Sequence, residues 1–491
     1  MVDLIQRLVK LVIGYGAVQW AGPLLSLIFT PIITRAVQPG EYGTAEYLLT
    51  IFSAISTVAL LALPQAVNTH FNDRPEDLDW QRQVVGSAFA LTVAAGLLAG
   101  IALILGAPAL AHQSSELTSY TWLLRLGGGL MVFGMSAIVL TSAAQTALRV
   151  RWGALFSLTS ILATVAGNIL FIVVLRLGTV GILFTPMASG LSLFIAAVVL
   201  TRPLIGRPRL AVIRLLLTSG LILLPTMGAT WILQLSDRLF LGQLVSPTEL
   251  GYYTIANKLA SLVNVVLAPI YSAWMPLALA MQHLPGALER YISMSRYLIA
   301  AILAAGLAIG LFAIEILILL TQPEYFPAAP YVGFLTYMHI LGGFGAILNT
   351  GALMGKQLTS ISSAVVAGAA INVCLNALLI PHYGIAGATA ATILGYALPQ
   401  ILLYALLQRR YPIAYPIKRI LAALGVQLIL LLLGLLIPPV AFPLRVTLKL
   451  GALIVLLAAY LGLGLILPAE LARFFVLTRR EIYKRIAKRS T

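Results

Sequence analysis

Charged residues are scarce in this sequence: 9% of the 491 residues are Asp, Glu, Lys or Arg, whereas 60% are hydrophobic. Soluble domains carry about 25% charged residues, so a soluble protein of this composition could not cover its surface with polar groups. The mean hydropathy of +1.00 points the same way. The composition therefore predicts an integral membrane protein.

Motifs for covalent, metal and nucleotide chemistry are missing as well. The single cysteine, Cys374, excludes an internal disulfide, and its apolar neighbours predict an inert side chain. The five histidines are not paired at metal-ligand spacing, and no Gly-rich phosphate loop followed by lysine occurs. We therefore expect neither an enzyme nor a metal site or bound cofactor.

Apolar runs long enough to cross a bilayer recur along the chain and predict an all-α membrane protein with about fourteen transmembrane helices. With the N-terminus inside, about 25 Lys and Arg face the cytoplasm and about 5 face outside, which predicts two cytoplasmic termini. The runs are residues 8–30, 42–66, 84–108, 120–143, 152–176, 180–200, 212–235, 248–275, 291–320, 329–352, 360–380, 384–406, 418–438 and 445–467.

Two short motifs recur at nearly the same offset. PGEYG (39–43) returns as PTELG (247–251), an offset of 247 − 39 = 208, and LGTVG (177–181) returns as YGIAG (383–387), an offset of 383 − 177 = 206. Residues 246–249 also have the order of a helix start, with Ser as the N-cap and Glu able to reach back to it. The shared offset predicts a duplicated six-helix unit.

The duplication predicts two pseudo-symmetric lobes around a central cavity, because an even number of spans gives both copies the same topology. Residues 1–206 would form the first lobe with helices 1 to 6, and residues 207–412 the second with helices 7 to 12. Residues 413–470 would add helices 13 and 14. Residues 471–491 would form a basic cytoplasmic tail, which we expect to bind anionic lipid and not nucleic acid.

Polar residues within the apolar runs indicate where the cavity lies, because a charge at the bilayer centre costs roughly 2.5–3.5 kcal/mol and normally faces protein or water. Lys258 is the deepest such charge, and a polar stripe runs beside it on one helix face. The stripe consists of Tyr253, Asn257, Ser261 and Asn264. We interpret Lys258 as a cation that lines a wet cavity and attracts an anionic headgroup; the alternative is a structural ion pair with Glu46 or Asp237.

Other polar side chains in the spans have two interpretations each. Glu46 lies on a polar face that suits a cavity wall. Arg35 and the Asp237–Arg238 pair lie at the outer ends of the first helix of each lobe, where snorkelling to the interface is the alternative. We expect Glu315 to make a packing contact. The asparagines expected to bond neighbouring helices are Asn168, Asn372 and Asn376.

Three segments resemble a known family: TRAVQPGEYG (34–43), SDRLFLGQLVSPTELGYYTIANKLASL (236–262) and INVCLNALLIPHYGIAGATAATILGY (371–396). They are similar to the hallmarks of bacterial polysaccharide-repeat flippases of the Wzx type, in the multidrug/oligosaccharidyl-lipid/polysaccharide exporter superfamily. The resemblance implies alternating access and transport of undecaprenyl-pyrophosphate-linked oligosaccharide to the outer leaflet of the bacterial inner membrane. It also implies a monomer that works beside membrane lipids and the polysaccharide polymerase machinery.

The resemblance implies a cationic cavity for the pyrophosphate and the sugars. Glu46 and Asp237 become candidate coupling or gating carboxylates, with Na⁺ or H⁺ as the coupling ion. The candidate cavity residues are Lys258, Asn257, Ser261, Arg35, Arg125 and Arg238.

Three alternatives remain open at this point. A cation-coupled multidrug exporter of the same superfamily would favour twelve helices and a carboxylate in an apolar cavity, whereas here the deepest charge is a lysine. A lipid II flippase is a close variant of the first interpretation. A membrane-embedded glycan polymerase would carry a long outer loop, which this sequence lacks.

Overall fold

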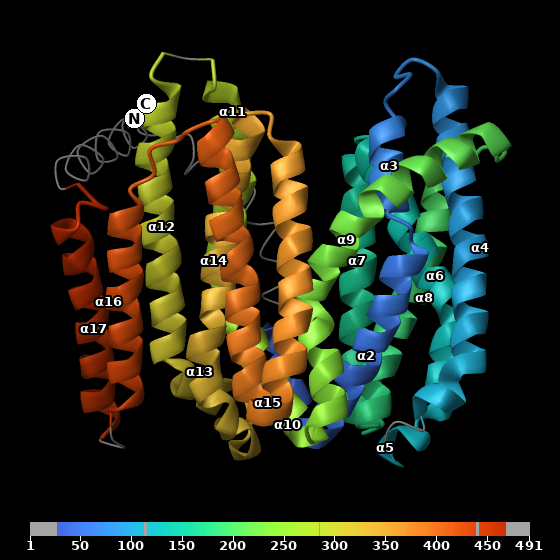
Figure 1. The fold of residues 1–491 in the computed structure, drawn as a ribbon. Coiled ribbons are helices and arrows are strands. Elements are labelled where there is room, and N and C mark those ends of the chain that lie inside the picture. Colours follow the sequence, from blue (N-terminus) through green and yellow to red (C-terminus); the bar gives the residue numbers. More distant parts are fainter. Residues whose placement is uncertain (1–26, 112–114, 284, 438–440, 468–491) are drawn as a thin grey trace, which may run out of the picture. The chain divides into compact units, whose positions relative to one another are not determined.

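A computed structural model describes residues 27–111, 115–283, 285–437 and 441–467, and every regular element in these ranges is a helix (Figure 1). Helices satisfy their own backbone hydrogen bonds, as a chain crossing hydrocarbon must. The predicted basic tail and most of the first predicted span lie outside the described residues.

Eleven helices in the described ranges are long and apolar enough to cross a membrane, so this is a multi-pass membrane protein. The 53-residue α15 (Leu358–Arg410) covers two predicted spans, with a kink at Gly384. The predicted span at 248–275 is divided into α10 (Pro247–Ala260) and α11 (Val263–Met281). The count of fourteen is therefore not confirmed, although each later apolar run forms a helix.

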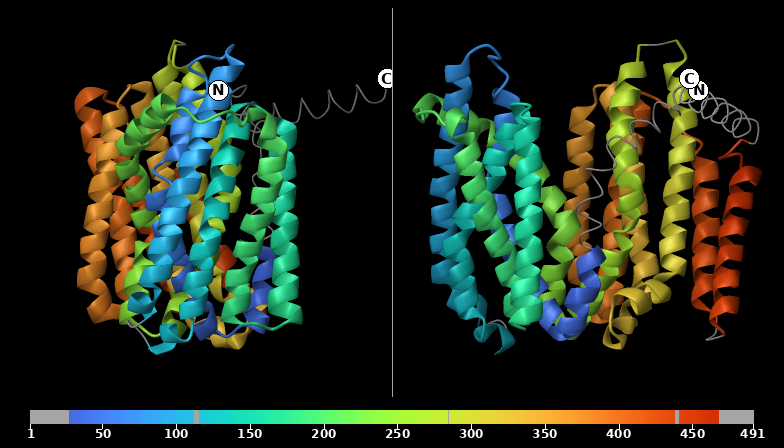
Figure 2. Two further views of the ribbon diagram at one scale, coloured as in Figure 1. Left: turned by 90° about the vertical axis from the view of Figure 1, so that its right-hand side faces the viewer. Right: turned by 180° about the vertical axis from the view of Figure 1, so that it is seen from behind.

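The chain folds into two compact units, and residues 28–254 with 365–391 make up the first, here the N-terminal unit. In it α4 and α6 lie side by side along their lengths (Figures 1 and 2). The helices contained wholly in this unit are α2 (Pro39–Ala59), α3 (Leu63–His70), α4 (Leu78–Ala111), α5 (Ser115–Thr118), α6 (Thr121–Thr146), α7 (Val150–Gly167), the π-helix η1 (Asn168–Val174), α8 (Thr179–Thr201), the 3₁₀ turn η2 (Arg202–Leu204) and α9 (Leu210–Leu244).

The packing of the N-terminal unit depends on small residues where helices cross. A Cβ on Gly100 of α4 would overlap the backbone of Gly128 on α6, so the two helices touch through their backbones. A break between α2 and α3 places Leu61 and Ala62 at positive φ, and the Leu61 carbonyl oxygen rests on Gly220 of α9. Close backbone approach of this kind is typical of helices in lipid, where burial of apolar surface does not drive association.

The rest of the described chain, residues 27, 255–364 and 392–467, belongs to the C-terminal unit. Trp274, Tyr291 and Tyr415 are buried in its core, where Tyr291 contacts the Trp274 ring at a tilt and the Tyr415 ring edge to face. Its last two helices lie beside α12 (Figure 1). The helices contained wholly in this unit are α11, α12 (Ala287–Leu311), α13 (Ala313–Leu320), the 3₁₀ turn η3 (Pro323–Ala328), α14 (Ala329–Met354), α16 (Ile417–Leu435) and α17 (Phe442–Gly462).

A buried ion cluster fastens α17 to α13 within the C-terminal unit. The Lys449 ammonium lies 2.6 Å from the Glu315 carboxylate, and Arg445 Nε lies 3.1 Å from the same group. Two cations thus share one carboxylate. Glu315 makes the contact between helices that we expected of it.

The predicted repeat reappears as matched backbone geometry. Gly178 has φ +54° and ψ −127°, and Gly384, 206 positions later, has φ +53° and ψ −128°. Each lies next to the glutamate that caps a helix start, Glu41 for the first and Glu249 for the second. The capping carboxylates accept equivalent backbone hydrogen bonds, each of 3.1 Å, from Gln38 and Ser246.

The two helix starts also pack against each other inside the N-terminal unit. A Cβ on Gly43 would overlap the carbonyl oxygen of Pro247, and a Cβ on Gly251 would overlap that of Pro39. This reciprocal contact has the form of a local two-fold axis between the copies. It supports a duplicated unit, and the lobe boundaries at 206/207 and 412/413 remain a prediction.

Candidate functional site

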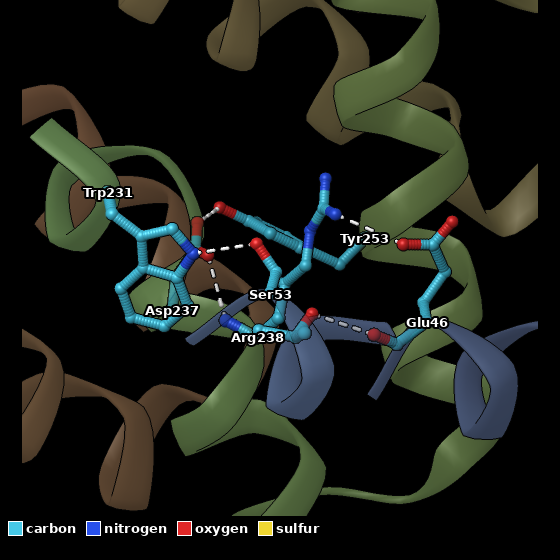
Figure 3. Close-up of polar contacts among 7 residues, drawn as sticks. Glu46, Ser53, Trp231, Asp237, Arg238 and Tyr253 are labelled. Atoms are coloured by element: carbon cyan, nitrogen blue, oxygen red, sulfur yellow. Dashed lines mark hydrogen bonds and ion pairs between the residues drawn. The ribbon is translucent and has the colours of Figure 1, made fainter. Parts of the chain in front are cut away.

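A cluster of charged and hydrogen-bonding side chains lies in the N-terminal unit where α2, α9 and the start of α10 meet (Figure 3). Its central contact is an ion pair between Arg238 Nη1 on α9 and Glu46 Oε2 on α2, at 3.1 Å. The two residues are 192 positions apart in the chain. Both side chains are mostly buried, so the pair is screened less than a surface ion pair.

Asp237, next to Arg238 in sequence, faces the other way and is 2% exposed. Its Oδ2 accepts a hydrogen bond from the Tyr253 hydroxyl on α10, and its Oδ1 accepts one of 2.8 Å from the Arg238 backbone N–H. These hydrogen bonds offset part of the cost of burying a carboxylate. Adjacent residues of α9 therefore contact two different helices.

A third polar contact extends the cluster along α2. Trp231 Nε1 donates a 2.9 Å hydrogen bond to Ser53 Oγ, two turns from Glu46 on the same face (Figure 3). Trp231 would suit an interfacial position by residue type, but here it links α9 to α2. Hydrogen bonds between helices take the place of the hydrophobic effect as a source of specificity in lipid.

The charge of this cluster favours an ion-pair exchange. Glu46 is paired with one nitrogen of the guanidinium, and Arg238 Nε is buried with no hydrogen-bond partner in the described part of the chain. A buried carboxylate is stable only while it is paired, so the Glu46–Arg238 contact is costly to break without a substitute. An anion that enters could replace Glu46 as the partner of Arg238.

The other predicted site residues lie elsewhere. Lys258, Asn257 and Ser261 belong to the C-terminal unit, where Asn257 is buried and the other two are half-buried. The Ser261 hydroxyl donates a 2.6 Å hydrogen bond to the Lys258 carbonyl oxygen, at the break between α10 and α11. Arg35 and Arg125 are exposed. The structure thus brings Glu46, Asp237 and Arg238 together in the N-terminal unit. Lys258, Asn257 and Ser261 belong to the C-terminal unit.

A buried amide network joins α15 to α9 in the N-terminal unit. Asn372 Oδ1 accepts hydrogen bonds from Ser236 Oγ at 3.0 Å and from Asn376 Nδ2 at 3.1 Å. Asn372 Nδ2 donates one of 3.2 Å to the Ala391 carbonyl oxygen. The expectation that Asn372 and Asn376 bond neighbouring helices is therefore confirmed. For Asn168 it is wrong, because its side chain has no hydrogen bond to any described residue.

Several site residues had no separate signal in the sequence. Trp231 is an ordinary residue type for an apolar span. Ser53 was visible only as a member of the polar face that Glu46 shares with Tyr42, Ser56 and Thr57, and its bond to Trp231 needs the packing of α2 on α9. Tyr253 was visible only as a member of the polar stripe, whereas its hydroxyl contacts Asp237 on α9. Among the described residues, no group of three or more His, Cys, Asp or Glu could hold a metal ion.

Comparison with solved structures shows the fold. A lipid II flippase MurJ in an inward closed conformation matches at a TM-score of 0.67 and 12% identity, covering 92% of this chain and 98% of that one. An inward-facing multidrug resistance MATE family transporter of the MOP superfamily matches at 0.64 and 15% identity, covering 79% and 94%. The MATE multidrug transporter DinF-BH matches at 0.57 and 15% identity, covering 83% and 96%.

A search of curated proteins found no matching relative. The model of the family described as "Polysaccharide biosynthesis protein" matches residues 8–282, more than half of the chain. The chain therefore combines this family match with the fold of the transporters and flippases named above. The chain belongs to the polysaccharide biosynthesis protein family.

Proposed function

We propose that the protein is a flippase that moves undecaprenyl-pyrophosphate-linked oligosaccharide repeat units from the cytoplasmic to the outer leaflet of the bacterial inner membrane. The units would supply the synthesis of cell-surface polysaccharide, such as O-antigen, capsule or exopolysaccharide. The observation that carries this proposal is the Glu46–Arg238 pair, an ion pair within apolar spans of a chain from this family.

The physical problem is the headgroup. A diphosphate cannot cross hydrocarbon unaided, while a polyprenyl tail can stay in lipid. Arginine binds phosphate in a two-pronged geometry, so Arg238 can exchange Glu46 for a phosphate oxygen when the released Glu46 is neutralised by H⁺ or Na⁺. Releasing Glu46 would then loosen α2 from α9. Binding of the headgroup and a change of helix packing are coupled in this way.

The remaining predicted residues take supporting roles in the proposal. Lys258, with Asn257 and Ser261 beside it, would offer a second cation and hydroxyl or amide groups to the headgroup. Arg35 and Arg125 would attract it electrostatically as it approaches. Glu46 or Asp237 would couple turnover to Na⁺ or H⁺, because a carboxylate released from its ion pair can bind either ion.

The proposal includes alternating access by a monomer with both termini in the cytoplasm, next to the polymerase that consumes its product. A lipid II flippase is the nearest rival, since a diphosphate headgroup would use the same arginine. A drug exporter is the second rival. A cationic drug would compete with Arg238 for Glu46, whereas the proposed cargo competes with Glu46 for Arg238.

A translocation assay separates these candidates. The purified protein would be reconstituted in vesicles with three cargoes: polyprenyl-pyrophosphate-linked oligosaccharide, lipid II and a fluorescent drug cation. We expect protein-dependent appearance of the oligosaccharide lipid in the opposite leaflet, measured with a membrane-impermeant lectin. Transport of the drug cation alone would refute the flippase, and transport of lipid II alone would reassign its cargo.

A further inference from the structure

The N-terminal unit contains a cavity of about 500 Å³ between α2, α6, η1 and α8. This volume is within the range of small-molecule sites, which is roughly 300–1,000 Å³. Most of its wall is apolar, with Phe52 on α2 and Met131, Met135 and Met187 on α6 and α8. None of the described residues that line it is Asp, Glu, Lys or Arg.

One polar side chain faces this cavity without a partner. Asn168 is 6% exposed, lines the cavity and forms no side-chain hydrogen bond with any described residue. An amide that is not engaged by the protein is available to an occupant of the cavity that can donate to it and accept from it. Ser56 on α2, Thr164 on α7 and Ser189 on α8 add hydroxyl groups to the cavity lining.

The backbone at Asn168 is unusual too. The α7 helix changes there into the π-helix η1, with the Leu175 N–H bonded to the Leu170 carbonyl oxygen five residues back. π-Helices are rare and occur frequently at functional sites. Asn168 stands at the point where the regular turns of α7 end and the wider turn begins. This backbone change is a second feature of the cavity, independent of the unpaired amide.

The cavity also adjoins the charged cluster through α2. Glu46, Leu49, Ser53 and Ser56 follow one another at steps of three, four and three, which is one helix face. Glu46 and Ser53 belong to the cluster, while Leu49 and Ser56 line the cavity. A molecule bound at Arg238 could therefore extend one end into the cavity.

We infer that this cavity is a subsite for a sugar residue of the cargo, an inference that rests on the proposed function. A neutral polyol suits a site with amide and hydroxyl groups but no charge, because an ion would be buried there without a counter-charge. The hydroxyls of a pyranose both donate to and accept from Asn168. Its C–H face packs on Phe52 and the methionines, whose flexible side chains adapt to different sugars.

Glycine positions allow the cavity to be filled without disturbing the fold. Gly134 on α6 lines the cavity, and a Cβ built there meets no atom within 4 Å. Gly129 on the same helix is equally open but does not line the cavity. Gly134→Leu is therefore a plug, and Gly129→Leu is its matched control. Asn168→Leu removes the amide at similar volume.

The test measures binding by native mass spectrometry of the purified protein. The two probes are polyprenyl-pyrophosphate-linked oligosaccharide and the same polyprenyl pyrophosphate without a glycan. We expect the wild type to prefer the glycosylated lipid at least tenfold. Gly134→Leu and Asn168→Leu should remove that preference and leave binding of the bare lipid unchanged, whereas Gly129→Leu should behave as the wild type.

Three results would overturn the subsite: no preference in the wild type, a preference that survives Gly134→Leu, or an equal loss of both lipids in the plugged variant. The proposed function fails separately, in the translocation assay. If the protein binds the glycosylated lipid through this cavity but moves no lipid between the leaflets of the vesicles, the proposed subsite stands and the proposed flippase function is refuted.

Discussion

Arg238 reaches Glu46 at 3.1 Å although the two residues are 192 positions apart in the chain, and Asp237 turns away from the pair towards Tyr253. The carboxylate of Glu46 is thus bound by the Arg238 side chain, while the carboxylate of Asp237 is bound by Tyr253. One carboxylate is fixed by hydrogen bonds, and the other depends on a single ion pair. The exchangeable member is Glu46.

Arg238→Ala should reduce translocation of the lipid-linked oligosaccharide at least about tenfold, because a charge-assisted contact to phosphate is lost and Glu46 is left without its ion-pair partner. The vesicle assay measures this loss. Arg74→Ala, a change on an exposed loop, is the control and should transport normally. Normal transport by Arg238→Ala would remove the arginine from the mechanism.

Lys258→Ala should abolish glycan export while the protein still inserts into the membrane. The physical reason is the loss of a half-buried cation from the segment beside Asn257 and Ser261. Complementation of a flippase-null strain, with membrane insertion checked by immunoblotting, measures the effect. Full complementation would show that Lys258 has no part in transport.

Gly178→Ala should destabilise the protein more than Gly384→Ala. Both glycines combine a positive φ with ψ near −127°, a region that glycine adopts readily and L-residues do not, but a Cβ at Gly178 would also lie 2.5 Å from Glu41 Oε1. The nearest atom at Gly384 is 3.7 Å away. Thermal unfolding in detergent should show this order, and Gly129→Ala, an open position inside α6 where alanine favours the helix, is the control that should not destabilise. The reverse order of the two losses would contradict the packing.

Gly43→Ala and Gly251→Ala should each lower stability, and the double variant should lose less than the sum of the two. Each added methyl group forces the same two helix starts apart, so the second finds the contact already opened. A double-mutant cycle on the unfolding temperature measures the coupling. Additive losses would mean that the two contacts are independent.

Glu315→Ala should destabilise the C-terminal unit more than Lys449→Met. Loss of the carboxylate leaves two cations, Arg445 and Lys449, facing each other, and removing one partner of a buried pair costs about 3–5 kcal/mol. Loss of Lys449 leaves a one-to-one pair of Arg445 with Glu315. The unfolding temperature measured in detergent should be lower for Glu315→Ala than for Lys449→Met. Equal decreases would contradict the idea that Glu315 neutralises both cations.

Much of the fold follows from the sequence because hydropathy alone determines which segments can cross lipid. Every apolar run after the first forms a helix, and the repeat was visible in glycines whose backbone angles prove to match. Ser246 and Glu249 formed the predicted cap because capping is a local interaction. Local chemistry and composition were therefore predictable.

The remaining features depend on contacts between distant segments. Leu61 and Ala62 carry positive φ although neither residue type favours it, because the break is held by packing on Gly220. The sequence identified Glu46 and Arg238 as separate charged residues, and their ion pair became visible only in the structure. Asn168 was expected to bond a neighbouring helix, but it lines the cavity at the junction of α7 and η1.

Residues 365–391 complete the N-terminal unit although more than a hundred residues separate them from the rest of it. During synthesis Ser236 therefore emerges long before Asn372, its hydrogen-bond partner. The N-terminal helices must therefore insert into the bilayer before residues 365–391, which complete their unit, have been synthesised. Biogenesis of the unit is accordingly a two-step process, in which the closing segment arrives from the far half of the polypeptide.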